Sequence, residues 1–130
     1  MRVMVVDDDP LLRRAFAGVL ARGGHDVSTA DTAERALRLA EVVQPVVALV
    51  DLNMPGGGLA LVRELKQMAG DSIHVAVVSG EDPDGIREAC LAAGADAVLG
   101  KPLTMGELRR HVAGAIISVS FAAEIAAKAS

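Results

Sequence analysis

The sequence predicts an α/β domain built on an open, five-stranded parallel sheet with helices on both faces. Short β-branched apolar runs alternate five times with longer segments whose apolar residues recur at helical spacing. The run at residues 46–50 is apolar throughout, which is typical of a strand buried on both faces of a parallel sheet. Glycine and proline clusters, such as Gly23-Gly24 and Gln44-Pro45, separate the segments. This (βα)5 order indicates a doubly wound sheet with right-handed crossovers.

Each element has its own signal in the chain. We expect strands at residues 3–6, 26–29, 46–50, 73–78 and 97–99, of which the second has the weakest pattern. We expect helices whose apolar faces fall within residues 11–20, 33–40, 59–68, 86–93 and 108–116. Asp9 ahead of Pro10 predicts the start of the first helix, because aspartate is a good N-cap and proline suits the first turn.

Length and composition narrow the class of protein. The 130 residues fit one domain, and 52% of them are hydrophobic, enough for an aliphatic core. A net charge of -4 and only 2% aromatic residues argue against nucleic-acid binding by this domain. Cys90 is the only cysteine, which excludes an internal disulfide and a zinc site made of several thiolates. The N-terminal apolar run is too short for a signal peptide or a membrane span, so we expect a cytoplasmic protein.

Charged and hydroxyl side chains follow four of the predicted strands. Asp7 and Asp8 come after the first strand, Asp51 after the third, Ser79 after the fourth and Lys101 after the fifth. Because the carboxyl ends of parallel strands meet at one edge of a sheet, we expect these side chains to converge there. Three clustered carboxylates repel one another unless a cation is present, and carboxylates with waters and a backbone carbonyl suit Mg²⁺. The sequence therefore predicts a magnesium site at this edge.

The same residues predict phosphoryl transfer to a carboxylate. Attack by Asp51 on an anionic phosphoryl group requires that the charge of that group be neutralised, which Mg²⁺ and Lys101 would do from different sides. Ser79 would donate its hydroxyl to a phosphoryl oxygen. The expected product is an aspartyl phosphate.

Four strings of the sequence resemble the signature blocks of response-regulator receiver domains of bacterial two-component signalling. They are VVDDDP at residues 5–10, VDLNMP at 50–55, VS at 78–79 and GKP at 100–102, in the family's order and spacing. The resemblance covers about residues 1–117. It implies a flavodoxin-like fold with strand order 2-1-3-4-5. It also implies a phosphorelay switch, phosphorylated by a sensor histidine kinase or phosphotransfer protein, that catalyses its own phosphorylation and dephosphorylation and is otherwise no enzyme.

The resemblance also implies a role for each site residue. Asp7 and Asp8 match the acidic pair, with Asp8 the more direct metal ligand, and Asp51 matches the phosphoacceptor. The remaining matches are the backbone carbonyl of Asn53 as a further Mg²⁺ ligand, Ser79 as the switch hydroxyl, and Lys101 as the family's lysine, in a cis peptide with Pro102.

Two positions near the site bear on how long the phosphoryl group persists. Asn53 and Glu81 occupy the places that tune hydrolysis of the acyl phosphate in the family. The Asn/Glu pair resembles that of the chemotaxis regulators, which dephosphorylate quickly. The resemblance therefore predicts a short-lived phosphoryl mark.

The sequence departs from the family at two places. Val98 stands where the family usually has an aromatic residue that follows the switch hydroxyl, and the chain has no tyrosine. The loop at residues 56–58 is one residue shorter than usual and reads Gly-Gly-Gly. Because glycine is costly to order, we expect this loop to be mobile until Mg²⁺ and the phosphoryl group bind.

Two other functions remain open beside the phosphoryl-accepting switch. An Asp-nucleophile phosphatase of the haloacid-dehalogenase type would need an aspartate two residues after Asp51, where this chain has Asn53. A pseudo-receiver would act only as a protein-interaction module, which a complete site argues against.

The segment at residues 118–130 and four scattered side chains carry weaker signals. The segment is alanine-rich and helix-compatible, and it would extend the last helix, mediate a homodimer, or link to an output domain. Cys90 is expected to be half-buried. The three histidines, which share no metal-ligand spacing, are expected to be surface or packing residues: His25, His74 and His111.

Overall fold

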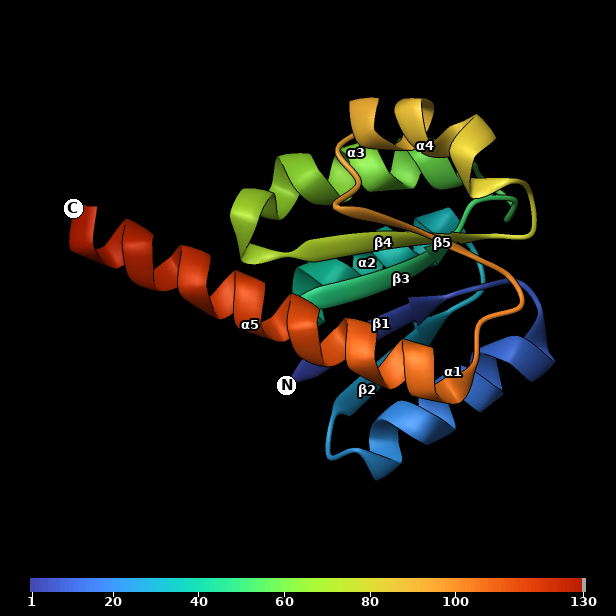
Figure 1. Cartoon of the computed structure of the whole chain (residues 1–130), viewed down its shortest axis with the longest axis horizontal. Helices are drawn as coiled ribbons and strands as arrows, with labels where there is room; N and C mark the ends of the chain where they lie inside the picture. Colours follow the sequence, from blue (N-terminus) through green and yellow to red (C-terminus); the bar gives the residue numbers. More distant parts are fainter. Residues whose placement is uncertain (130) are drawn as a thin grey trace.

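The computed structural model describes residues 1–129 and contains one five-stranded parallel sheet with helices on both faces (Figure 1). The strand order is β2-β1-β3-β4-β5, which confirms the expected fold class and topology. The strands are β1 (Arg2–Val6), β2 (Asp26–Ala30), β3 (Val47–Asp51), β4 (His74–Ser79) and β5 (Ala97–Gly100). Their ends lie within one residue of the predicted ones.

The helices divide between the two faces of the sheet. They are α1 (Pro10–Arg22), α2 (Ala33–Val43), α3 (Gly58–Ala69), α4 (Pro83–Ala92) and α5 (Met105–Ala129), with a short 3-10 helix η1 (Gly70–Ser72) after α3. Phe16 and Leu20 of α1 and Leu108 of α5 share one core cluster with alternate residues of the strands. Buried residues of α2, α3 and α4 share the other. This two-sided burial explains why the central strands are apolar throughout.

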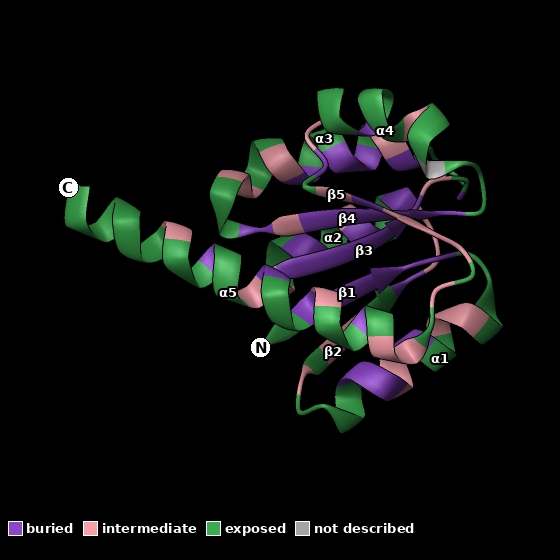
Figure 2. Cartoon of the chain, in the orientation of Figure 1, coloured by how far each residue is buried: buried purple, intermediate pink, exposed green. Residues whose placement is uncertain are grey.

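The central strand β3 shows how the sequence pattern produces this packing. Val47 and Leu49 face the α1/α5 core, whereas Ala48 and Val50 face the core under α2 and α3. Every residue of β3 is buried, and the buried colour follows the central strands in Figure 2. Asp51 ends this strand, so its carboxylate is held on a rigid element.

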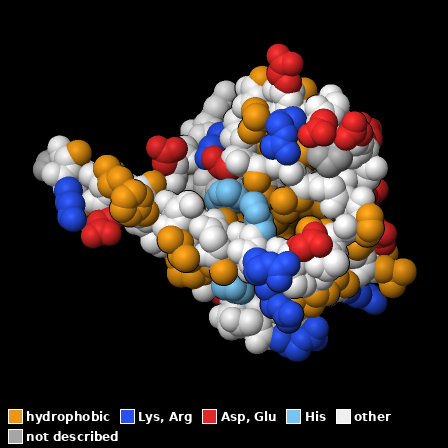
Figure 3. All heavy atoms as spheres, viewed as in Figure 1, with side chains coloured by type: hydrophobic (Ala, Val, Ile, Leu, Met, Phe, Trp, Pro, Cys, Tyr) orange, Lys and Arg blue, Asp and Glu red, His pale blue; other side chains and the backbone are white. Residues whose placement is uncertain are grey.

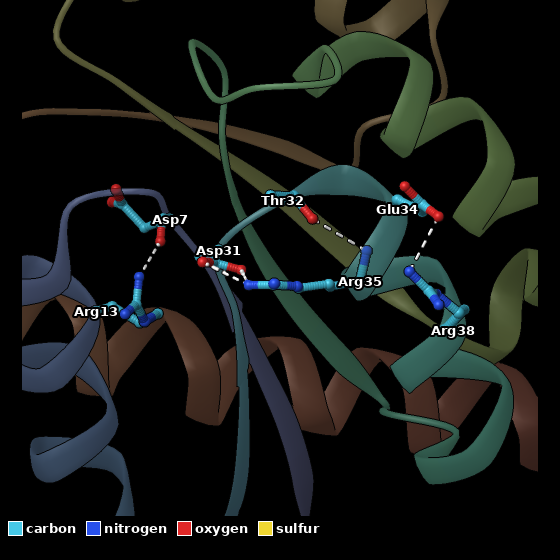
Figure 4. Close-up of polar contacts among 7 residues, drawn as sticks. All are labelled: Asp7, Arg13, Asp31, Thr32, Glu34, Arg35 and Arg38. Atoms are coloured by element: carbon cyan, nitrogen blue, oxygen red, sulfur yellow. Dashed lines mark hydrogen bonds and ion pairs between the residues drawn. The ribbon is translucent and has the colours of Figure 1, made fainter.

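Side-chain caps fix the starts of the first two helices. The Asp9 carboxylate accepts a hydrogen bond from the Leu11 N–H at 2.9 Å, which confirms the predicted N-cap of α1. Thr32 accepts from the Arg35 N–H at 3.2 Å at the start of α2 (Figure 4). These caps set where the chain turns from the strand ends into the helices, next to the candidate site.

Cys90 is fully buried, so the expectation of a half-buried residue was wrong. It lies on the inward face of α4, in the core that also contains Val98 and Ala93. Burial raises the pKa of its thiol above the usual value. The short helix α4 packs on the sheet through this narrow face. The spacing of apolar residues indicates which face of a helix is buried, but not how deeply each residue on that face is buried.

Helix α5 runs without a break to Ala129 and projects beyond the sheet, toward the terminus marked C in Figure 1. Its first half packs on the sheet through Leu108, Val112 and Ala115. By length and composition alone, α5 would be able to cross a membrane, although 17% of its most apolar 18-residue window is buried inside the domain. Residues 118–129 therefore continue α5, and Ser130 lies outside the described residues.

Candidate functional site

Three carboxylates meet at the carboxyl ends of β1 and β3. Asp7 and Asp8 follow β1 directly, and Asp51 ends β3, the neighbouring strand. One ligand oxygen from each carboxylate lies within 4.8 Å of the other two. Asp7 and Asp51 are only 3% and 7% exposed, whereas Asp8 is exposed. Buried carboxylates this close repel one another, so the cluster fits a hard divalent cation such as Mg²⁺.

Asp7 is held in place by the turn that leads into α1. Its Oδ1 accepts a hydrogen bond from the Asp9 N–H at 2.9 Å, and its backbone carbonyl accepts one from Arg13 Nη1 at 2.8 Å (Figure 4). Burial raises the pKa of the Asp7 carboxyl above its usual value; the Lys101 charge opposes this and the Asp51 charge adds to it. A bound cation would offset the same cost by favouring the ionised form.

Lys101 brings a positive charge to the same cluster. Its Nζ lies 3.6 Å from Asp7 Oδ2 and 3.5 Å from Asp51 Oδ1. The backbone supports this position, because the Lys101 N–H donates to the Ser79 carbonyl at 2.7 Å. The peptide between Lys101 and Pro102 is cis, as expected. The ammonium group thus approaches the cluster from the side of the sheet where β4 and β5 lie.

Ser79, at the end of β4, is fully buried. Its Oγ accepts a hydrogen bond from the Glu81 N–H at 3.1 Å, which leaves its own O–H free to donate. The Asn53 N–H donates to Asp51 Oδ1 at 3.3 Å. Asn53 and Glu81 are both exposed beside the cluster, in the loops after β3 and β4.

Val98 is a buried core residue and not a surface residue beside the acidic cluster. It lies in β5, paired in register with Val77, and is 7% exposed within the core under α2, α3 and α4. The residue in the family's aromatic slot is therefore an ordinary core side chain.

The glycine loop after β3 is shaped by close approach of the backbone. Gly56 and Gly57 have φ values of 95° and 88°, which favour glycine. A Cβ on Gly58 would lie 2.6 Å from the Leu52 carbonyl oxygen and 2.8 Å from that of Asp51. Sequence reasoning expected these glycines to permit mobility and missed this contact, which depends on where α3 begins.

The comparisons with known proteins match this geometry. The family model described as "Response regulator receiver domain" matches residues 3–113. The chain is 33% identical over 111 residues to the KDP operon transcriptional regulatory protein KdpE of Escherichia coli, covering 85% of this chain and 48% of that protein. It is 39% identical over 112 residues to the transcriptional regulatory protein PrrA of Mycobacterium leprae, with the same two shares.

Solved structures show the same fold. NtrX of Brucella abortus, in a crystal with ADP, superposes with a TM-score of 0.89 at 26% identity, covering 96% of this chain and 29% of that one. A CheY-like receiver domain protein of Methanospirillum hungatei gives 0.86 at 25% identity, covering 92% and 95%. The chain belongs to the response regulator receiver domain family. It spans less than half the length of KdpE and PrrA.

Proposed function

We propose that this signalling domain accepts a phosphoryl group on Asp51 from a sensor histidine kinase or a phosphotransfer protein. The arrangement of Lys101 supports this best: its Nζ lies about equally far from the carboxylates of Asp7 and Asp51, 3.6 and 3.5 Å away. A cation held there is suited to a group that carries its own negative charge. The side chains that this chemistry requires are all present at the site.

Each residue has a defined part in the transfer. A carboxylate oxygen of Asp51 attacks phosphorus, and the P–N bond to the donor histidine breaks, leaving its electron pair on the imidazole nitrogen. Lys101 neutralises charge on the phosphoryl oxygens, and the Ser79 O–H donates to one of them. Asp7, Asp8, Asp51 and the Asn53 carbonyl would hold Mg²⁺, which when bound supplies further charge neutralisation.

Incubation with MgCl2 and acetyl phosphate or phosphoramidate, followed by intact-mass measurement, tests the proposed function. A phosphoryl-accepting switch gains the mass of one phosphoryl group. Continuous turnover of a phosphate ester with little adduct would indicate the phosphatase alternative, against which Asn53 stands two residues after Asp51. The absence of both would indicate a pseudo-receiver and would overturn the proposal.

Replacing Asp8 by asparagine should weaken Mg²⁺ binding by roughly tenfold or more, because the exposed, direct ligand loses its charge. The chain has no tryptophan or tyrosine, so calorimetry is the suitable measurement. Asp26→Asn is the matched control. Asp26 is an exposed acid at the start of β2, at the end of the sheet opposite the acidic cluster. Equal affinity in Asp8→Asn and wild type would remove Asp8 from the ligand set.

The phosphoryl mark should be short-lived, lasting minutes rather than hours. Asn53 and Glu81 are both exposed beside Asp51 and Ser79, where water would have access to the acyl phosphate. The decay of the phosphorylated mass after removal of the phosphodonor measures its lifetime. A lifetime of many hours would contradict this prediction.

The projecting half of α5 supports a homodimer. Ile117, Phe121 and Ile125 are spaced four residues apart on one face and are 69%, 62% and 52% exposed. Phe121→Glu should lower the self-association constant measured by sedimentation velocity, whereas Ala126→Glu, on another face, should not. An unchanged constant in Phe121→Glu would place any dimer elsewhere.

The compartment proposed for the domain is the cytoplasm. The packing of Leu108, Val112 and Ala115 against the sheet supports this, because a membrane-spanning α5 would have to leave that core. We also propose that the domain makes no direct contact with nucleic acid, because its net charge is -4. An output domain beyond residues 118–130 stays a prediction.

A further inference from the structure

Two histidines that are far apart in the sequence point their ring nitrogens at each other. His74 is the first residue of β4, and His111 lies in the second turn of α5. Their Nε2 atoms are 3.0 Å apart, with ring centroids 5.0 Å apart and planes inclined by 55°. Both side chains are partly exposed, and Figure 3 shows histidine side chains reaching the surface on this face of the molecule. The pair is therefore open to a small solute.

The pair lies away from the acidic cluster. His74 begins β4, whereas Ser79 ends it, so the two sites are at opposite ends of the sheet. Asp96 is an acid whose charge acts on His74, and its Oδ2 already accepts from the Val75 N–H at 2.8 Å and from Lys66 Nζ at 2.9 Å. The two imidazole nitrogens meet here at hydrogen-bond distance, and imidazole ligands suit borderline transition metals better than Mg²⁺.

The geometry points to a two-histidine site for a divalent transition-metal ion, Ni²⁺ or Cu²⁺, that ties β4 to α5 through Nε2 of His74 and Nε2 of His111. A metal about 2.0–2.1 Å from each nitrogen would see the pair at roughly 95°, given their present separation. That angle suits adjacent positions of a square-planar or octahedral ion and is narrower than the tetrahedral angle of structural Zn²⁺. Water would fill the other positions.

The ligating form of both rings is already favoured. Burial lowers the pKa of His74 and that of His111 below the usual histidine value, so both are neutral at neutral pH. In the metal-free pair one ring carries a proton on Nε2 and donates a hydrogen bond through it to Nε2 of the other ring. On metal binding, that ring takes the Nδ1–H tautomer, so both Nε2 lone pairs become available without net loss of a proton.

The metal would act on the attachment of α5 to the sheet. His111 precedes the part of α5 that projects beyond the domain, and His74 belongs to a strand buried on both faces. An ion that binds only when these two elements are together stabilises the folded arrangement by mass action. We therefore expect Ni²⁺ to raise the unfolding temperature of the wild-type chain.

Calorimetric titration with NiCl2 tests the site, using chain without an affinity tag and with excess MgCl2 to fill the acidic cluster. Wild type should bind one Ni²⁺ per chain. His74→Gln and His111→Gln should each weaken binding by roughly tenfold or more. His25→Gln is the matched control, because His25 lies just before β2, outside the pair, and should bind as wild type does.

Two further measurements separate a lost ligand from a lost fold. Circular dichroism in EDTA shows whether each variant is folded. In separate samples without EDTA, NiCl2 should raise the unfolding temperature of wild type and His25→Gln alone. Electron paramagnetic resonance of the wild-type chain with Cu²⁺ should show two nitrogen ligands, a result that needs no variant. No Ni²⁺ binding by wild type, unchanged binding in both pair variants, or a Cu²⁺ spectrum without nitrogen would overturn the proposal.

Discussion

Replacing Asp51 by asparagine should abolish the phosphoryl adduct formed from acetyl phosphate and MgCl2. Asparagine keeps the size of the side chain at the buried end of β3 but has no carboxylate oxygen to attack phosphorus. Intact-mass measurement over time records the loss as a rate too low to detect.

Asp9→Asn is the matched control for this prediction. Asp9 lies two residues from Asp7, but its carboxylate caps α1, and asparagine is an equally good N-cap. The control should be phosphorylated at nearly the wild-type rate. A full adduct in Asp51→Asn would show that another residue accepts the phosphoryl group.

Gly58→Ala should lower the free energy of unfolding by about 1–3 kcal/mol, because the added methyl group overpacks the turn after β3. Its Cβ would approach the Leu52 carbonyl oxygen to 2.6 Å and the Asp51 carbonyl oxygen to 2.8 Å. Both contacts are with backbone, so no side chain can move aside. Urea denaturation followed by circular dichroism measures the change.

The same substitution should slow phosphorylation, because the backbone displaced is that of Asp51 and the residues that lead to Asn53. Gly114→Ala serves as the control, since a Cβ there meets nothing within 4 Å and the residue lies inside α5. It should raise stability by about 0.5–1 kcal/mol. Wild-type stability and rate in Gly58→Ala would mean that the loop packs differently.

The strands and the residues that follow them were predictable from the sequence. A strand buried on both faces must be apolar throughout, so its end is marked by the first charged residue, as at Asp7 and Asp51. Parallel strands then place these ends together without further information. The same logic located Ser79 and Lys101.

Features that depend on how helices cross the sheet were not predictable. The contact between His74 and His111 joins residues 37 positions apart and requires α5 to pass over the start of β4. Cys90 is buried because α4 turns that side to the sheet. Glycine is needed at position 58 because the turn after β3 brings this residue against the backbone carbonyl groups of Asp51 and Leu52, where the turn begins.

Locating the phosphoryl group within the chain tests the central claim most directly. After reaction with acetyl phosphate and MgCl2, borohydride reduces an aspartyl phosphate to a stable homoserine, and trypsin then releases residues 39–63 and residues 3–13 as separate peptides. The first contains Asp51 and one other acid, Glu41; the second contains the three aspartates after β1. We predict the altered mass in the first peptide, at Asp51. A modification confined to the second peptide, or at Glu41, would contradict the account.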